Sequence, residues 1–219
     1  AVPSESVEAT AICQQQPFAL TDVQYAYWIG REPNQPLGGV GCHAYLEIDG
    51  QGIDPDRLQQ AWQLLFQTHP MLSARFTQDG QQYIPALRQT PVITVHDCRQ
   101  YSLAEAAAHN TQVRQRLSHR VLDIAAGQVA GLELSLLPEQ HHRLHFDIDL
   151  LVADVQSLHI LLRDLAEAYH GRHRLRANPE WQFATYLITE RQQNEPKKQL
   201  DRAFWQQQLA TLPTGPQLP

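Results

Sequence analysis

Residues 141–157 read HHRLHFDIDLLVADVQS, and the periodicity of the apolar residues changes within this stretch. Up to Asp149, apolar and polar residues alternate, which is typical of a strand with one buried face. From Val155 onward, apolar residues recur every three or four positions, which is typical of an amphipathic helix, and Gly171 is a natural end for it. The sequence therefore predicts a strand that leads through a short loop into a helix.

The same alternation predicts further strands earlier in the chain. Residues 130–137 alternate and are joined to the strand after residue 141 by a short polar turn, so the two runs predict a hairpin. Residues 43–49 predict a half-buried strand, and residues 71–77 and 92–97 predict two more.

Helices are predicted from helical spacing and from the residues at their ends. One helix would begin with Thr21 or Asp22 as its cap and end near Gly30. The pair Asp54-Pro55 is a typical start for the next one. Three more segments predict helices, namely residues 103–118, 181–194 and 197–211. Because strands and helices do not alternate strictly, we expect an α/β (α+β) fold with a mixed sheet flanked by helices, not a doubly wound parallel sheet.

The composition excludes several classes of protein. The 219 residues carry a formal net charge of −6, whereas a nucleic-acid-binding domain usually has a basic excess on one face. No apolar run approaches the roughly 20 residues that span a bilayer, and the N-terminus shows no signal-peptide pattern. The three cysteines are widely spaced and odd in number, which indicates neither a disulfide framework nor a metal site, so we expect a reducing cytoplasm.

Segments rich in proline, glutamine and small residues border the predicted fold. We expect residues 1–16 to be a linker from an upstream domain and residues 212–219 to be a second linker. Residues 17–211 remain between them, which is enough for a core or for one lobe of a larger domain.

Two carboxylates, Asp149 and Asp154, stand five residues apart at the predicted strand-to-helix junction, and Ser157 follows three residues later. One interpretation is structural: Asp154 would cap the helix, which is worth about 1 kcal/mol, and Asp149 would be the polar end of a strand. The other is functional, because loops between rigid elements often position reactive groups. The spacing alone favours the structural interpretation.

The junction resembles the Asp-x4-Asp-x2-Ser signature of heterocyclization domains, a branch of the condensation domains of non-ribosomal peptide synthetases. Ordinary condensation domains have His-His-x3-Asp-Gly there. When the two patterns are aligned on Asp154, Asp149 replaces the first histidine and Leu150 replaces the second. Leu150 cannot transfer a proton, so the usual histidine route is closed in this chain.

Two other segments carry the same resemblance in the family's order. Residues 18–31, FALTDVQYAYWIGR, resemble the first heterocyclization motif, Phe-Pro-Leu-Thr-x2-Gln-x-Ala-Tyr-x2-Gly-Arg, with Ala19 in place of the proline. Residues 68–76, THPMLSARF, resemble the second motif, with Thr68 in place of an arginine. By itself the first segment would be an amphipathic helix, and we expect His69 in the second to be a hydrogen-bonded structural histidine rather than a base.

The segment from His141 to Asp147 is superficially similar to the ordinary His-His motif. Its aspartate comes one residue too late, and the histidines stand at the start of a strand. We expect these histidines to be hairpin surface, and a metal site there would lack carboxylate or cysteine partners at ligand spacing.

The resemblance implies a fold like that of chloramphenicol acetyltransferase, in which two lobes form a V around a channel. This chain matches the first lobe, which we expect to be inactive alone. Carrier domains would present thioesters on phosphopantetheine arms, and no cofactor would bind the lobe directly. The amine of a carrier-bound Cys, Ser or Thr would form an amide with the upstream acyl group, and cyclodehydration would give a thiazoline or oxazoline.

The resemblance also implies roles for particular residues. Asp149, Asp154 and Ser157 would form the catalytic motif, in which the aspartates polarise one end of the channel. Asp154 would act mainly as an anchor, through an ion pair with an arginine of the second lobe, and that lobe would supply key cyclodehydration residues. Five further residues would shape the motifs and the channel: Tyr27, Gly30, Arg31, His69 and Leu150.

The motifs most resemble siderophore synthetases of the yersiniabactin and pyochelin kind, which favours Cys and an aryl or salicyl donor. The expected partners are an upstream aryl or peptidyl carrier domain, a downstream peptidyl carrier domain, the C-terminal lobe and an adenylation domain. Two alternatives stay open. One is a stand-alone acyltransferase, which would need a catalytic histidine near the end of the chain, where the sequence has none. The other is a docking lobe that only binds carrier domains.

Overall fold

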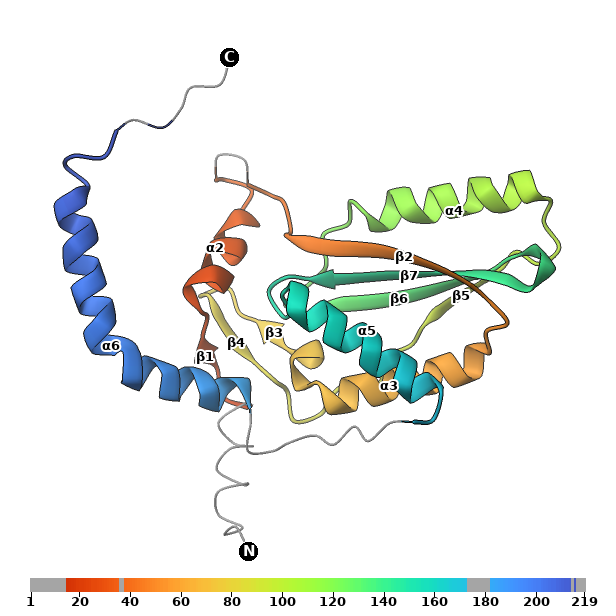
Figure 1. The fold of residues 1–219 in the computed structure, drawn as a ribbon, viewed down its shortest axis with the longest axis horizontal. Coiled ribbons are helices and arrows are strands. Elements are labelled where there is room, and N and C mark those ends of the chain that lie inside the picture. The colour runs from red at the N-terminus through yellow and green to blue at the C-terminus, as the bar shows by residue number, and fades with distance from the viewer. Residues whose placement is uncertain (1–14, 36–37, 173–181, 214, 216–219) are drawn as a thin grey trace, which may run out of the picture.

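The computed structural model describes residues 15–35, 38–172, 182–213 and 215, and its larger sheet contains four strands (Figure 1). Their order is β2 (His43–Gln51), β7 (His141–Asp149), β6 (Ala130–Leu136) and β5 (Thr94–Asp97). β7 is antiparallel to both of its neighbours, whereas β5 is parallel to β6. The predicted mixed sheet is therefore confirmed.

The β6–β7 hairpin fixes which residues face each side of this sheet. Leu134 lies opposite Leu144, and Leu46 lies opposite Phe146, so even-numbered positions of three neighbouring strands share one face. The turn between β6 and β7 is a short 3-10 helix, η2 (Pro138–Gln140), in which Glu139 and Gln140 have positive φ angles. The even-numbered residues of β2, β6 and β7 that belong to the core are Ala44, Leu46, Ala130, Leu132, Leu134, Leu136, Leu144, Phe146 and Ile148.

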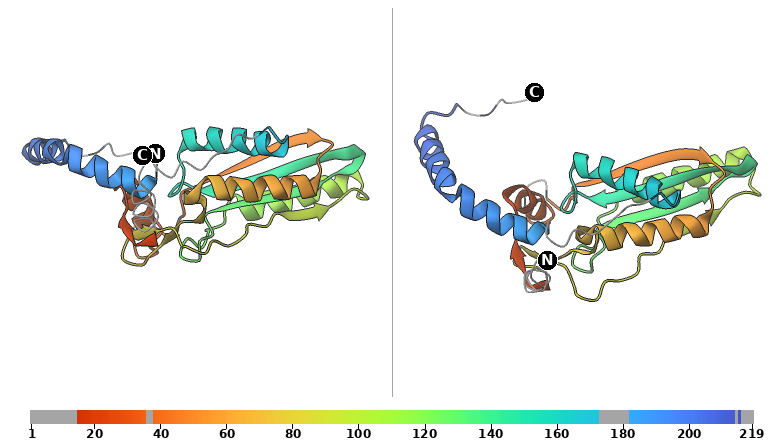
Figure 2. Two further views of the ribbon diagram at one scale, coloured as in Figure 1. Left: turned by 90° about the horizontal axis from the view of Figure 1, so that it is seen from below. Right: turned by 60° about the horizontal axis from the view of Figure 1, so that its bottom comes forward.

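Two helices cover this apolar face, α3 (Pro55–Thr68) and α5 (Val155–Tyr169) (Figures 1 and 2). α3 begins at Asp54-Pro55 as predicted, and Asp54 caps it by accepting a hydrogen bond from the Asp56 N–H at 2.9 Å. The rings of Trp62 and Phe146 pack edge to face with centroids 6.0 Å apart, which joins α3 to the central strand.

The opposite face of the sheet is polar and lies against α4 (Leu103–Leu117). The expectation that the histidines of the hairpin are surface residues is correct for His141 but wrong for His142 and His145, which are buried. His145 is at an odd-numbered position of β7, so its ring points between the sheet and α4.

A second sheet of three short strands lies beside the first, in the order β1 (Phe18–Ala19), β4 (Gln81–Tyr83) and β3 (Arg75–Phe76). The strand predicted at 71–77 is thus shorter, because residues 70–73 form the 3-10 helix η1 (Pro70–Ser73), which Pro70 initiates.

The helix α2 (Asp22–Gly30) follows β1 and begins with a capping box. The Thr21 hydroxyl accepts the Gln24 N–H at 3.1 Å, and the Gln24 side chain accepts the Thr21 N–H at 3.0 Å. Thr21 is therefore the cap, and Arg31, rather than Gly30, is the C-terminal cap residue.

One curved helix, α6 (Phe183–Gln208), replaces the two helices predicted at 181–194 and 197–211 (Figure 1). Pro196 lies inside it; proline removes one backbone hydrogen bond but here does not end the helix. The predicted linkers, 1–16 and 212–219, lie largely outside the described residues. No helix among the described residues is long and apolar enough to cross a membrane.

Gly131 leaves room for a buried ion pair on the polar face. Arg120 Nε and Nη2 donate to the two oxygens of Asp147 at 2.6 and 2.9 Å, and Asp147 is fully buried. A Cβ atom at Gly131 would lie within 2.6 Å of Asp147 Oδ1 and even closer to Arg120 Nη2.

We expect Gly131→Ala to lower the free energy of unfolding by about 3 kcal/mol, because it displaces Arg120 and leaves a buried carboxylate unpaired. Urea denaturation measures this change. Gly30→Ala is the control: no atom lies within 4 Å of its added Cβ, so its effect should stay below about 1 kcal/mol. Equal effects of the two substitutions would contradict the explanation.

Candidate functional site

The loop from β7 to α5 contains the aspartates of the predicted motif. Asp154 caps α5: its Oδ1 accepts the Ser157 N–H at 2.7 Å and the Ser157 hydroxyl at 2.6 Å. These hydrogen bonds from Ser157 hold the pKa of Asp154 below its usual range. These contacts confirm the helix-cap interpretation. Asp154 is also exposed, so its carboxylate remains accessible.

Asp149, in contrast, is 1% exposed and is held by two donors. Its Oδ1 accepts the Leu151 N–H at 3.0 Å, and its Oδ2 accepts a hydrogen bond from Arg31 Nη1 at the end of α2. Burial raises the pKa of Asp149, while the Leu151 N–H and the Arg31 charge act in the opposite direction. Arg31 also donates to the Leu122 carbonyl, which fixes the guanidinium in one orientation.

Gln24, near the start of α2, holds the same loop at a second point. Its Nε2 donates to the Leu151 carbonyl at 2.6 Å, and its amide exchanges two 2.9 Å hydrogen bonds with the buried amide of Gln82. Our sequence reasoning did not select Gln24 or Gln82 as site residues. The available signal was that Gln24 occupies the fixed glutamine position of the first motif.

A cavity of about 640 Å³ lies between α2, η1, the loop and the N-terminal half of α5. Five of the predicted site residues line it, namely Tyr27, His69, Leu150, Asp154 and Ser157. Gly30, Arg31 and Asp149 are not among its lining residues. The two aspartates therefore have different surroundings: Asp154 borders the cavity, and Asp149 is enclosed with Arg31 behind the loop.

His69, the C-terminal cap of α3, is hydrogen-bonded as expected. Its Nε2 lies 2.9 Å from Asp164 Oδ2 on α5, and Asp164 is 4% exposed. The other oxygen, Oδ1, accepts hydrogen bonds from the Arg163 guanidinium at 2.9 and 3.1 Å. Sequence reasoning missed Asp164, because its helical spacing does not distinguish it from a solvent-exposed residue.

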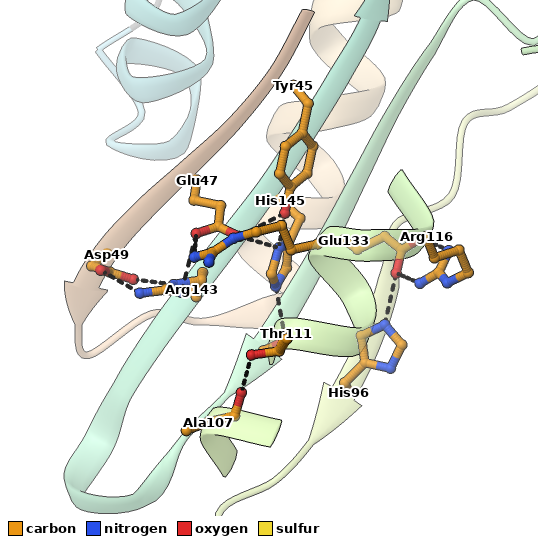
Figure 3. Close-up of polar contacts among 12 residues, drawn as sticks. Tyr45, Glu47, Asp49, His96, Ala107, Thr111, Arg116, Glu133, Arg143 and His145 are labelled. Atoms are coloured by element: carbon orange, nitrogen blue, oxygen red, sulfur yellow. Dashed lines mark hydrogen bonds and ion pairs between the residues drawn. The ribbon is translucent and has the colours of Figure 1, made fainter. Parts of the chain in front are cut away.

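A second polar group lies on the face of the sheet beneath α4 and includes His145, Tyr45 and Glu47 (Figure 3). His145 Nε2 lies 3.1 Å from Ser135 Oγ, its Nδ1 lies 2.8 Å from Tyr45 Oη, and Tyr45 donates to Glu47 at 2.8 Å. His145 and Ser135 are fully buried, so a substrate cannot reach them. This network is structural.

Glu133 belongs to the same polar face and is also fully paired. Arg116 donates to its two oxygens at 2.9 and 2.7 Å, and His96 Nε2 lies 2.7 Å from Oε2. Burial acts to raise the pKa of Glu133, but the hydrogen bonds and charges of Arg116 and His96 together outweigh it and lower this pKa to about 2. Within the described ranges, no group of three His, Cys, Asp or Glu side chains could hold a metal ion.

The condensation-domain family model matches residues 14–219. The chain belongs to the condensation-domain family. Among its relatives, the pyochelin synthetase PchE of Pseudomonas aeruginosa is 38% identical over 220 residues, which covers 99% of this chain and 15% of the relative. The phenyloxazoline synthase MbtB of Mycobacterium tuberculosis is 39% identical over 208 residues, covering 93% of this chain and 14% of the relative.

The structural comparison supports the same family. The cyclization–docking bidomain of EpoB from Sorangium cellulosum superposes with a TM-score of 0.86 at 29% identity, covering 95% of this chain and 42% of that chain. These similarities confirm the predicted resemblance to heterocyclization domains and the predicted fold. This condensation-domain chain spans about 15% of the length of the curated relatives named here.

Loss of the ion pair between Arg31 and Asp149 should be strongly destabilising, because removal of Arg31 leaves a buried unpaired carboxylate. We expect Arg31→Met to lower the free energy of unfolding by about 3–5 kcal/mol in guanidinium denaturation. The matched control is Arg99→Met, which removes an exposed ion pair with Asp97 and should cost less than about 1 kcal/mol. A loss at Arg31 no larger than at Arg99 would refute the assigned role.

Burial lowers the pKa of His145 to about 4, below the value of about 6.5 for an exposed histidine. The unfolded chain therefore binds a proton between about pH 6.5 and pH 4 that the folded chain does not, so stability is lost as pH falls through this window. We expect wild type to lose roughly 3 kcal/mol more than His145→Gln between pH 7 and pH 4. Parallel stability–pH curves of the two proteins would show that His145 is not the group responsible.

Proposed function

We propose that this chain is the N-terminal lobe of a heterocyclization domain in a non-ribosomal peptide synthetase. The domain would join a carrier-bound acyl group to carrier-bound Cys, or to Ser or Thr, and would cyclise the product to a thiazoline or oxazoline. The observation that carries this proposal is the β7–α5 loop. Leu150 lines the cavity where ordinary condensation domains have a histidine, and Asp149 and Asp154 flank it in the heterocyclization spacing.

The relatives support this substrate chemistry. One is a phenyloxazoline synthase and another a pyochelin synthetase, and one of the matching solved structures is a cyclization–docking bidomain. We therefore favour a siderophore-type pathway with an aryl donor. The partners would be an upstream carrier domain, a downstream peptidyl carrier domain, the C-terminal lobe and an adenylation domain, and Cys42 and Cys98, both free, fit the cytoplasm.

In the first stage the amine nitrogen attacks the acyl thioester, the C–N bond forms, and the C–S bond breaks to release a protonated thiol. In the second stage the side-chain thiol or hydroxyl attacks the new amide carbonyl, and the carbonyl oxygen leaves as water. Both reactants are tethered by phosphopantetheine arms, so the cavity makes the first stage effectively unimolecular.

The described residues divide these tasks. Asp149 is enclosed and paired, so it holds the β7–α5 loop through Arg31 and the Leu151 N–H. It thereby positions the loop residues that line the cavity. Asp154 keeps a lowered pKa and stays charged, so its accessible oxygen can orient a cationic or hydrogen-bond-donating substrate group at the N-terminus of α5. The proton donor for the lost water would come from the second lobe.

We expect Asp149→Asn and Asp154→Ala, each in the complete synthetase, to lower ring formation at least about a hundredfold. Asp149→Asn removes the charge that retains Arg31, and Asp154→Ala removes both the cap and the accessible carboxylate. The carriers are loaded with acyl donor and Cys, and the released products are identified by mass spectrometry. Asp97→Asn, on an exposed ion pair, is the control.

Near-normal thiazoline yields in both variants would refute the role of the aspartates. A wild-type synthetase that forms neither amide nor ring, although its carriers are loaded and bind the domain, would indicate the docking-lobe alternative.

A further inference from the structure

The cavity is lined by a histidine, His69, that has one ring nitrogen engaged in a hydrogen bond. His69 Nε2 is bound to the buried Asp164, and no other described residue contacts His69 Nδ1 through a hydrogen bond. The side chain of His69 is 26% exposed and lines the cavity. Because Asp164 is a carboxylate acceptor, the proton of a neutral His69 belongs on Nε2, which leaves a lone pair on Nδ1.

Few side chains along this cavity can exchange a proton. Among its described lining residues the titratable groups are Tyr27, His69 and Asp154. Asp154 accepts two hydrogen bonds from Ser157, and its lowered pKa makes it a weak base. Imidazole is the side chain that ordinarily exchanges protons near neutral pH, which distinguishes His69 from the carboxylate and the phenol.

The loop offers no competing base. Leu150 lines the same cavity and holds the position of the second histidine of ordinary condensation domains, but it has no group that can accept a proton. Asp149 is enclosed with Arg31 and is not among the lining residues. Among the described residues that line the cavity, His69 is therefore the acceptor best suited to a proton released there.

We propose that His69, held by Asp164, is the proton acceptor for the amine in the condensation step; this inference rests on the proposed function. The amine nitrogen forms the C–N bond with the thioester carbonyl carbon and loses its proton to His69 Nδ1. The C–S bond then breaks, and the imidazolium returns the proton to the departing thiolate. Asp164 is the positioning residue: it fixes the tautomer and stabilises the imidazolium, as a carboxylate does for histidine bases in hydrolases.

Among the described residues, the charged groups that are hydrogen-bonded at His69 or at its partner are Asp164 and Arg163 of α5. Asp164 Oδ2 contacts His69 directly, and Arg163 donates hydrogen bonds to Asp164 Oδ1. The arginine therefore offsets part of the negative charge of Asp164 without a hydrogen bond to the His69 ring. Asp164→Asn would remove the negative charge but keep a hydrogen-bond acceptor. Amide formation should then slow, because the carboxylate that orients the ring and stabilises the imidazolium is lost, whereas cyclisation of a preformed amide should not change.

The test uses the complete synthetase with loaded carriers and measures the two stages separately. We expect His69→Gln to slow single-turnover amide formation about a hundredfold and to remove the acidic limb of its pH profile. Cyclisation of a chemically prepared carrier-bound N-acyl-cysteinyl thioester should stay within about threefold of wild type, because that amide no longer carries the proton in question. His119→Gln, an exposed histidine away from the cavity, is the matched control.

Several outcomes would overturn the inference. One is amide formation by His69→Gln at the wild-type rate. Another is an equal loss of rate in amide formation and in cyclisation together with a lowered Tm, because that result indicates a structural role for His69. If His69→Gln does not fold, amide formation by Asp164→Asn at the wild-type rate would also overturn the inference. A wild type that forms neither amide nor ring would overturn the proposed function as well, whereas normal products from wild type and His69→Gln alike would overturn this inference alone.

Discussion

The buried ion pair between Arg31 and Asp149 is the constraint on which the candidate site depends. It joins the end of α2 to the end of the central strand β7, and Asp149 in turn orients the loop through the Leu151 N–H. Gln24 holds the Leu151 carbonyl from the other end of the same helix. Because a buried carboxylate is costly without its partner, α2 and the loop have one stable arrangement, and the cavity beside them keeps its shape.

The larger sheet has one apolar face and one charged face, because successive side chains of each strand point to opposite sides. Even-numbered side chains such as Phe146 pack under α3 and α5, while odd-numbered ones such as His145 and Asp147 lie under α4. The described charged groups at the centre of that polar face are paired, as Asp147 with Arg120 and Glu133 with Arg116. The polar face thus gives α4 a defined position, and the site is built on the loop at one end of this rigid layer.

The two acids of the motif have separate physical roles. Asp154 makes local hydrogen bonds to Ser157 and remains accessible, whereas Asp149 has lost access to solvent and acts through Arg31. A carboxylate used as a helix cap keeps its charge, so it can serve structure and still face a substrate. His69 likewise combines two positions: it ends α3 with its Nε2 bound to Asp164 of α5, and its side chain lines the cavity.

The sequence by itself determined the elements whose causes are local. The alternation in residues 141–149, the cap at Asp154 and the start of α3 at Asp54 depend on neighbours a few positions away, so they could be predicted. Only the tertiary structure decided which polar residues are buried and with which residues they pair. Arg31 and Asp149 are 118 residues apart, and His69 and Asp164 are 95 apart. Pairings over such separations follow from how helices and strands pack, which periodicity does not encode; for the same reason His145 was expected on the surface and lies in the interior.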